Sequence, residues 1–155
     1  MIQRMQSLFL LLAAGFSLLF LGGSAFNCVD ETGQPVMLML SGSLTDKAGQ
    51  SFAHVGPLWP VTAVIVMISA VSLIAIFLYR RRDIQMKLAM ALIILSGCFI
   101  AALGYYGYVV VNSYKLDIVP GFRTGIPLAV LILAVLAYRG IRKDDSLVRS
   151  YDRLR

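Results

Sequence analysis

Only a few side chains in this sequence belong to types that carry out catalysis or bind metal ions, and their spacing keeps them apart. His54 is the only histidine among the 155 residues, so a histidine-based metal site would lack its second imidazole. Asp144 and Asp145 are adjacent carboxylates, but they lie in a polar C-terminal tail. The sequence also lacks the HExxH, CxxC, P-loop and GxSxG motifs. We therefore predict a non-enzymatic protein with no catalytic residue, no cofactor and no metal site.

The two cysteines are predicted to remain free thiols. Cys98 lies ten residues after the start of the apolar run at Leu88, which places it about 15 Å along a helix. Cys28 lies at the opposite edge of the apolar segments, whereas a disulfide needs Cα atoms within about 7 Å. Cys28 also does not suit lipid attachment, because Phe26 and Asn27 precede it where lipoprotein cysteines follow small residues.

Most of the sequence consists of long stretches without charged residues, and these stretches form the helices between which the polar side chains lie. Of the residues, 59% are hydrophobic and 14% are charged, whereas soluble domains average about 25% charged residues. A helix needs about 20 mostly apolar residues to cross the hydrocarbon core of a membrane. We predict spans at 7–27, 61–79, 88–111 and 124–141. The fourth contains a shorter apolar run, which can still span if Arg123 and Arg139 extend toward the two headgroup layers.

These spans predict an all-α membrane protein, a four-transmembrane-helix bundle that forms a single domain over residues 1–155. The first span starts weakly basic and ends in small residues, so a signal peptide cleaved after Ala25 is the alternative. Its apolar run exceeds the about 7–15 residues of signal peptides, and we expect the segment to be retained.

The distribution of Lys and Arg predicts how the bundle is oriented. Four spans put both termini on one side, which carries one basic residue before the first span, four in the 80–87 loop and six from Arg139 onward. The other side carries three. Short loops rich in Lys and Arg stay in the cytoplasm, so we predict cytoplasmic N and C termini. The expected topology determinants are Arg80, Arg81, Arg82, Lys87, Arg142 and Lys143.

The largest segment on the opposite, extracytoplasmic side covers residues 28–60. Val36–Leu40 is an apolar run of strand length, and turn-forming residues flank it. The segment forms either a small β-hairpin or three short strands, or it is an irregular loop, and the sequence leaves this open. Trp59 and the tyrosines near the outer ends of spans two and three suit the headgroup level.

A row of small residues in the third span is the candidate for close helix packing. Gly97, Ala101 and Gly104 follow one another at i, i+4 and i+7, on one face of a helix. Small side chains let helices approach closely in lipid, where hydrophobicity supplies no drive for association. This face either packs within the bundle or holds another membrane subunit.

The cytoplasmic tail, residues 142–155, is predicted to contain a short amphipathic helix. Such a helix either anchors to anionic lipids of the inner leaflet or docks a cytoplasmic partner. Its apolar stripe consists of Leu147, Val148, Tyr151 and Leu154.

Both ends of the chain carry specific motifs. The start Met-Ile-Gln-Arg-Met-Gln, the leucine-rich first span and the ending Leu-Val-Arg-Ser-Tyr-Asp-Arg-Leu-Arg resemble a family of small four-span inner-membrane proteins of Bacteroidota, classed as a domain of unknown function. The resemblance covers the whole chain in length and span order. It implies a bacterial inner membrane, with the 28–60 loop in the periplasm, and it implies no catalytic residue.

Apart from Arg139, which lies near the inner end of the fourth span, the predicted spans carry no charge. This argues against a transporter or proton pump, which usually needs ionisable groups inside the bilayer. The first expectation is a structural or accessory subunit of an inner-membrane assembly, with membrane lipids and another integral membrane protein as partners. The alternatives are a carrier or lipid-handling protein for an apolar molecule, and an envelope sensor. Nucleic acid is not an expected partner, because most basic residues flank apolar runs, where phospholipid headgroups are the nearer anions.

Overall fold

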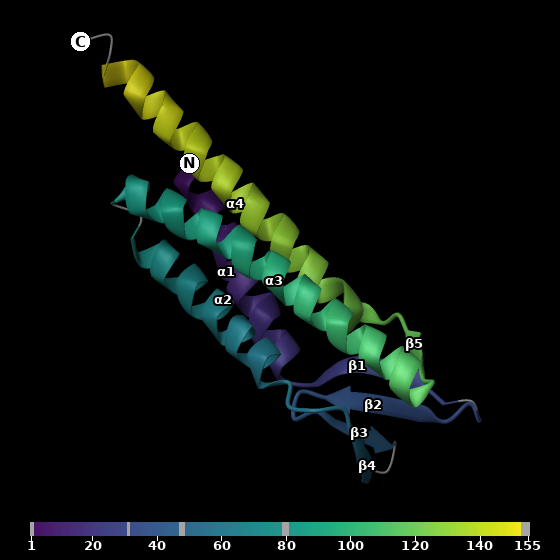
Figure 1. Ribbon diagram of the computed structural model, residues 1–155. Coiled ribbons are helices and arrows are strands. Elements are labelled where there is room, and N and C mark those ends of the chain that lie inside the picture. The colour runs from purple at the N-terminus through teal and green to yellow at the C-terminus, as the bar shows by residue number, and fades with distance from the viewer. Residues whose placement is uncertain (1, 31, 47–48, 79–80, 153–155) are drawn as a thin grey trace.

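Four helices and five strands make up the part of the chain that the structure describes. The structure is a computed structural model that describes residues 2–30, 32–46, 49–78 and 81–152, with the backbone alone at 2–4, 82 and 147–152. The helices run side by side, and the strands gather at one end of them (Figure 1). The molecule is therefore a helix bundle with a sheet across one end.

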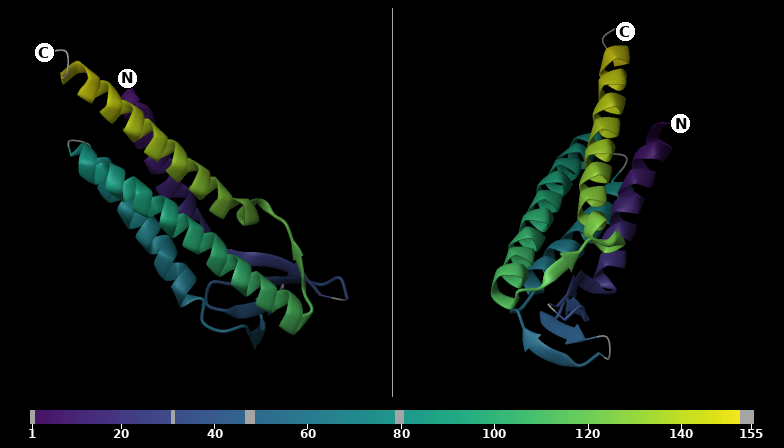
Figure 2. Two further views of the ribbon diagram at one scale, coloured as in Figure 1. Left: turned by 45° about the horizontal axis from the view of Figure 1, so that its top comes forward. Right: turned by 90° about the vertical axis from the view of Figure 1, so that its right-hand side faces the viewer.

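The helices alternate in direction along the chain. Each of the first and third helices contacts both the second and the fourth. The start of α1 and the end of α4 lie at the end of the bundle away from the sheet (Figures 1 and 2). The prediction of four helices is confirmed, and their bounds are α1 (Ile2–Leu21), α2 (Trp59–Phe77), α3 (Arg82–Tyr114) and α4 (Phe122–Asp152).

The first helix differs from its predicted span. That prediction placed residues 7–27 in one helix, but α1 ends at Leu21. Two glycines follow at 22 and 23, and glycine is a poor helix former because it loses the most conformational freedom when it is ordered. Strand β1 (Ser24–Val29) then begins. Its apolar residues had extended the predicted span, because hydropathy alone does not separate a buried strand from the end of a membrane helix.

An antiparallel five-stranded sheet corrects the all-α prediction. Four strands come from residues 24–54, so this segment is a sheet and not an irregular loop. The fifth comes from the α3–α4 connection and pairs with β1, with Ile118 opposite Cys28. The sequence pattern did not predict it. The order across the sheet is β4 (Ser51–His54), β3 (Ser43–Asp46), β2 (Pro35–Met39), β1 and β5 (Asp117–Val119).

The sheet and the helices share one hydrophobic core. Val36, Leu38 and Leu44 are buried on the sheet, in the same cluster as Phe20 of α1 and Leu58 just before α2. The core of the sheet is therefore continuous with the core of the helix bundle, and the sheet packs on the bundle through apolar contacts.

Two tyrosines near the C-terminal end of α3 attach this long helix to the β4–α2 connection. The hydroxyl of Tyr106 donates a 3.0 Å hydrogen bond to the carbonyl oxygen of Pro57. The hydroxyl of Tyr114 donates a 2.7 Å hydrogen bond to the carbonyl oxygen of His54. Because α3 extends past the start of α2, its last turns lie beside the sheet.

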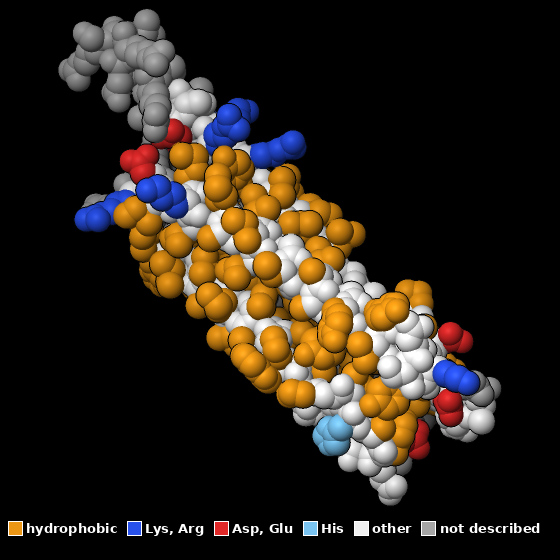
Figure 3. Space-filling model, viewed as in Figure 1, with side chains coloured by type: hydrophobic (Ala, Val, Ile, Leu, Met, Phe, Trp, Pro, Cys, Tyr) orange, Lys and Arg blue, Asp and Glu red, His pale blue; other side chains and the backbone are white. Residues whose placement is uncertain are grey.

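The surface of the bundle is apolar around its middle. Hydrophobic side chains cover the helical surface in view, and most Lys and Arg side chains gather at the end opposite the sheet (Figure 3). Among the described residues, three helical segments are long and apolar enough to cross a membrane, and the apolar part of α1, Met5–Leu21, is shorter. The chain is a multi-pass membrane protein. The three segments are Trp59–Phe77, Asp83–Tyr114 and Phe122–Ser146.

Candidate functional site

The row of small residues on α3 faces away from the bundle. Gly97, Ala101 and Gly104 are all exposed. A Cβ atom added at either glycine would meet no atom within 4 Å, apart from its own helix and chain neighbours. Packing inside the bundle therefore does not describe these residues. We call them the open stripe of α3.

Other small residues allow the helices to approach one another inside the bundle. Ser17 of α1 and Ser69 of α2 are buried, and their hydroxyl oxygens lie 2.7 Å apart in a hydrogen bond between the two helices. Hydrogen bonds of this kind average only about 0.6 kcal/mol in a membrane protein, so close packing contributes as well as polarity. The buried small residues of the helices include Ala13, Ala14, Ser17, Ser69, Ser72, Ala75, Ala89, Ser96, Ala134 and Ala137.

An apolar cavity of about 240 Å³ lies where α1, β1, α3 and α4 meet. Phe20 and Ala25 on its floor are almost fully buried, whereas Gly104 and Leu128 on its rim are exposed. The exposed rim comes from α3 and α4, so the cavity opens sideways between these two helices. Its lining consists of Phe20, Ala25, Phe26, Ile100, Leu103, Gly104, Thr124, Pro127 and Leu128. We call it the lateral cavity.

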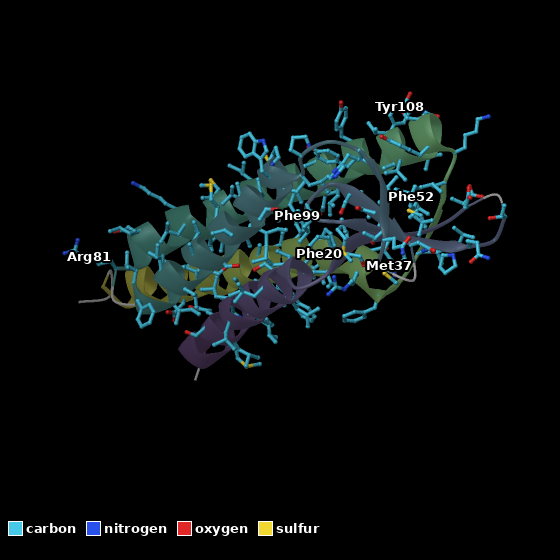
Figure 4. All side chains as sticks on the ribbon, turned by 90° about the horizontal axis from the view of Figure 1, so that it is seen from below. Phe20, Met37, Phe52, Arg81, Phe99 and Tyr108 are labelled. Carbon is cyan, nitrogen blue, oxygen red and sulfur yellow. The ribbon has the colours of Figure 1, made fainter. Side chains whose placement is uncertain are left out.

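An aromatic pair borders the lateral cavity from inside the bundle. Phe20 packs edge-to-face on Phe99, with ring centroids 5.1 Å apart and an interplanar angle of 89°. The side chains of Phe20 and Phe99, both labelled, lie close together between the helices (Figure 4). Both rings are fully buried, so the cavity ends against packed aromatic surface.

The lateral cavity lies close to the sheet end of the apolar band. Tyr106 is bonded to Pro57, two residues before α2 begins. Gly104 precedes Tyr106 by two residues, about 3 Å along the helix. On α4, the lining begins two residues after the helix starts, also about 3 Å. On both α3 and α4, the cavity therefore begins about 3 Å from the sheet end of the apolar surface.

Arg123 connects the first turn of α4 to the end of α1. Its guanidinium donates hydrogen bonds to the carbonyl oxygens of Ser24, at 3.1 Å, and Leu19, at 3.3 Å. The last carbonyls of a helix have no partner within it, and a cation there also complements the helix dipole. We had expected Arg123 to extend toward the headgroups, but the structure places it half-buried against another helix. No sequence pattern had identified this contact.

Comparison with known proteins places nearly the whole chain in one family. A family model described as "Domain of unknown function (DUF4293)" matches residues 2–154. The chain belongs to this family. No curated protein and no solved structure matches the chain at a significant level. The helices, the sheet and the lateral cavity all fall within the matched residues.

In this DUF4293 chain, the predicted topology determinants that are described lie at the end of the bundle opposite the sheet. Arg81, just before α3, marks this end in Figure 4. Arg80 and the side chain of Arg82 lie outside the described residues. The exposed determinants are Arg81, Lys87, Arg142 and Lys143.

The predicted amphipathic tail extends α4 without a break as far as Asp152. The side chains that would form its apolar stripe lie outside the described residues, so tail docking stays a prediction. These residues are Leu147, Val148, Tyr151 and Leu154.

The thiols and the histidine of this DUF4293 chain do not come together. Cys28 is buried in β1 and Cys98 is exposed on α3, and both are free as predicted. Burial raises the pKa of the Cys28 thiol, so the thiol stays protonated and weakly nucleophilic at neutral pH. His54 is exposed at the end of β4. Within the described ranges, no group of three His, Cys, Asp or Glu residues could hold a metal ion.

Proposed function

We propose that the chain is a non-enzymatic protein of the bacterial inner membrane that serves as a structural or accessory subunit of a membrane assembly. The open stripe of α3 carries this proposal. It presents helix backbone on the outer surface of the bundle, between bulky exposed side chains such as Ile94 and Tyr105.

The open stripe has the chemistry of a contact between membrane helices. Within the bundle, small residues already let the four helices approach one another. The same residue types on the outside allow one more helix to approach, because close packing and not hydrophobicity drives association in lipid. The occupant that we propose is a transmembrane helix of another subunit.

We further propose that both termini lie in the cytoplasm and the sheet lies in the periplasm. The charged end of the bundle supports this orientation, since the exposed basic residues near α3 and at the end of the α4 span lie there together. Lys and Arg beside membrane spans favour the cytoplasmic side.

The lateral cavity raises a second candidate function, that of a carrier or lipid-handling protein for an apolar molecule. Its volume of about 240 Å³ lies below the roughly 300–1,000 Å³ of pockets that enclose a small molecule. The buried Phe20–Phe99 pair also blocks its inner side. A cavity of this size suits binding of part of a molecule better than transport of a whole one, so we favour the accessory subunit.

Co-purification from native membranes in mild detergent tests the accessory role. We expect the chain to elute in a complex with another integral membrane protein. Gly97→Leu should reduce the amount of that partner, because the new side chain separates the two helices. Ala70→Leu is the control, since Ala70 is a small exposed residue on α2.

Two results would contradict the accessory role. One is a chain that elutes alone, as a 17.0 kDa protein in its detergent micelle. The other is a partner whose yield survives Gly97→Leu as well as it survives Ala70→Leu.

A further inference from the structure

We propose that the lateral cavity binds one acyl chain of an anionic phospholipid from the periplasmic leaflet. The proposal uses the orientation given above but not the accessory role, and the cavity lining shares only Gly104 with the open stripe. Four observations support it: the direction of the opening, the depth, the lining and the adjacent positive charge.

The opening faces the membrane and not water. On α3 the lining residues Ile100, Leu103 and Gly104 are spaced i, i+3 and i+4, so they share one helix face. The lining residues of α4 have the same spacing. The lining residues of α1 and β1 are all buried, whereas the exposed ones, Gly104, Thr124 and Leu128, belong to α3 and α4. A chain can therefore enter sideways from lipid.

The depth corresponds to the start of the acyl chains. The cavity begins about 3 Å inside the level at which Tyr106 meets Pro57. Exposed Trp59, Tyr105 and Tyr108 lie near the same end of the helices, and such side chains favour the headgroup layer. The first methylene groups of a lipid lie just beneath that layer, level with the opening.

The lining selects hydrocarbon over water. Thr124 is the only residue in it with a polar side chain, and its hydroxyl oxygen already accepts a 3.3 Å hydrogen bond from the backbone N–H of Gly121. A water molecule needs two to four polar partners, and apolar cavities stay dry. An empty cavity would forfeit dispersion contacts with its walls, which an acyl chain at the rim would recover.

The charge beside the cavity selects the headgroup. Arg123 directly precedes Thr124 in the lining, and its guanidinium is bonded to Ser24, directly before Ala25 on the floor. Both of its hydrogen bonds go to backbone carbonyls, and no carboxylate among the described residues neutralises it. The guanidinium is not part of the lining but lies next to it in the chain at Thr124 and through its contact with Ser24, and we place the phosphate of a bound lipid beside it.

Photocrosslinking to the purified full chain in vesicles tests the site. The probe is a phospholipid with a diazirine near the start of one acyl chain, built on an anionic glycerol headgroup or a zwitterionic choline headgroup. We expect adducts at 100–104 and 124–128, with more labelling by the anionic lipid. Adducts spread evenly over the exposed helix surfaces would overturn the proposal, and equal labelling by both lipids would overturn the choice of an anionic lipid.

Two glycine variants separate this site from the docking of a subunit. Gly104→Leu places a side chain at the mouth of the cavity, where a Cβ meets no atom within 4 Å, and an unchanged melting temperature would show that the variant is folded. We expect labelling to fall about tenfold, which corresponds to losing the burial of about two methylene groups. Gly97→Leu lies on the open stripe but outside the cavity and should leave labelling unchanged. Equal labelling of Gly104→Leu and the unaltered chain would refute the site, whereas loss of partner in Gly97→Leu bears only on the accessory role.

A free fatty acid carrying the same diazirine is the remaining arm. If it labels the cavity residues and the phospholipid does not, the site takes a free fatty acid and the proposed phospholipid is wrong. We expect the phospholipid to label at least as strongly, because it is held in the leaflet at the depth of the opening.

Discussion

The guanidinium of Arg123 occupies the space that a Cβ atom at Gly23 would need. The contact joins the start of α4 to the connection between α1 and β1, where Arg123 also binds the carbonyl oxygens of Leu19 and Ser24. A Cβ at position 23 would therefore displace the guanidinium, and the side chain that would have to move is the one that completes the end of α1.

Substitution of the two adjacent glycines should have unequal effects. Gly23→Ala should lower the free energy of unfolding by about 1 kcal/mol, because the new methyl group displaces the guanidinium from its hydrogen bonds to Leu19 and Ser24. Gly22→Ala should change it by less than about 0.5 kcal/mol, since a Cβ there has only an ordinary 3.7 Å contact with the carbonyl oxygen of Leu19. Thermal unfolding in detergent measures both.

A double-mutant cycle should assign the effect to Arg123. In an Arg123→Ala background the space above Gly23 is vacant, so Gly23→Ala should cost much less than it does alone, giving the non-additivity expected of contacting residues. Equal costs in the two backgrounds would show that the strain lies elsewhere.

Close contact between α1 and α4 should depend on Gly140. A Cβ at Gly140 would lie 2.9 Å from Cγ of the buried Gln6. Gly140→Leu should therefore push the two helices apart and lower the melting temperature by several degrees. Gly125→Leu lies on the same helix at an exposed position with no atom within 4 Å of its Cβ, and it should leave the melting temperature nearly unchanged. A similar loss in both variants would point to the exposed leucine and not to the contact.

Modification of Cys28 should be slow at neutral pH and should accelerate as the pH rises. The thiolate is the reactive form, and burial raises the pKa of this thiol above its usual value. The protonated form is therefore favoured in the folded chain, so its contribution to stability is complete below the usual thiol pKa and is lost as the pH rises through the raised pKa. Maleimide rates in a Cys98→Ala variant measure this.

An exposed cysteine near β2 provides the control for that rate. Ser41→Cys, made in a chain with both native cysteines replaced, lies at an exposed position between β2 and β3. It should react much faster than Cys28 at neutral pH. Equal rates at neutral pH would mean that Cys28 is accessible and unperturbed.

The orientation of the bundle should be readable with the same reagent from two sides. In intact cells whose outer membrane is permeable to it, a membrane-impermeant maleimide should label Ser41→Cys and spare Ser146→Cys. Ser146 is exposed near the end of the apolar segment of α4. Labelling should reverse in inside-out vesicles. Labelling of Ser146→Cys from outside the cell would contradict cytoplasmic termini.

Hydropathy predicts the helices because crossing a membrane imposes a minimum apolar length, and α2 begins within two residues of its predicted start. The same measure fails where an apolar segment pairs with other strands. Strand β1 looked like the end of a span, and β5 has only three residues, too few for a period-2 pattern. Strand pairing between segments far apart in the sequence leaves no local signal.

The site was harder to predict than the fold. The spacing of Gly97 and Gly104 indicates a shared helix face but not the direction in which that face points, and the structure turns it outward. Arg123 resembled a headgroup cation because it borders an apolar run. Its contact with the end of α1 had one indirect signal in the sequence. This signal is the adjacent pair Gly22 and Gly23, which ends the first apolar run a hundred residues before Arg123.

The position of β5 beside β1 orders the biogenesis of the protein. β1 can pair with β2 once the segment between α1 and α2 has been made, but its other edge stays bare until α3 has inserted and residues 117–119 follow it. A chain halted after α2 would present an unpaired strand edge at the sheet end of the bundle, which is a template for aggregation. Strand β5 can therefore cover this edge of β1 only after α3 has inserted, and a chain that stopped before residue 117 would leave the edge open.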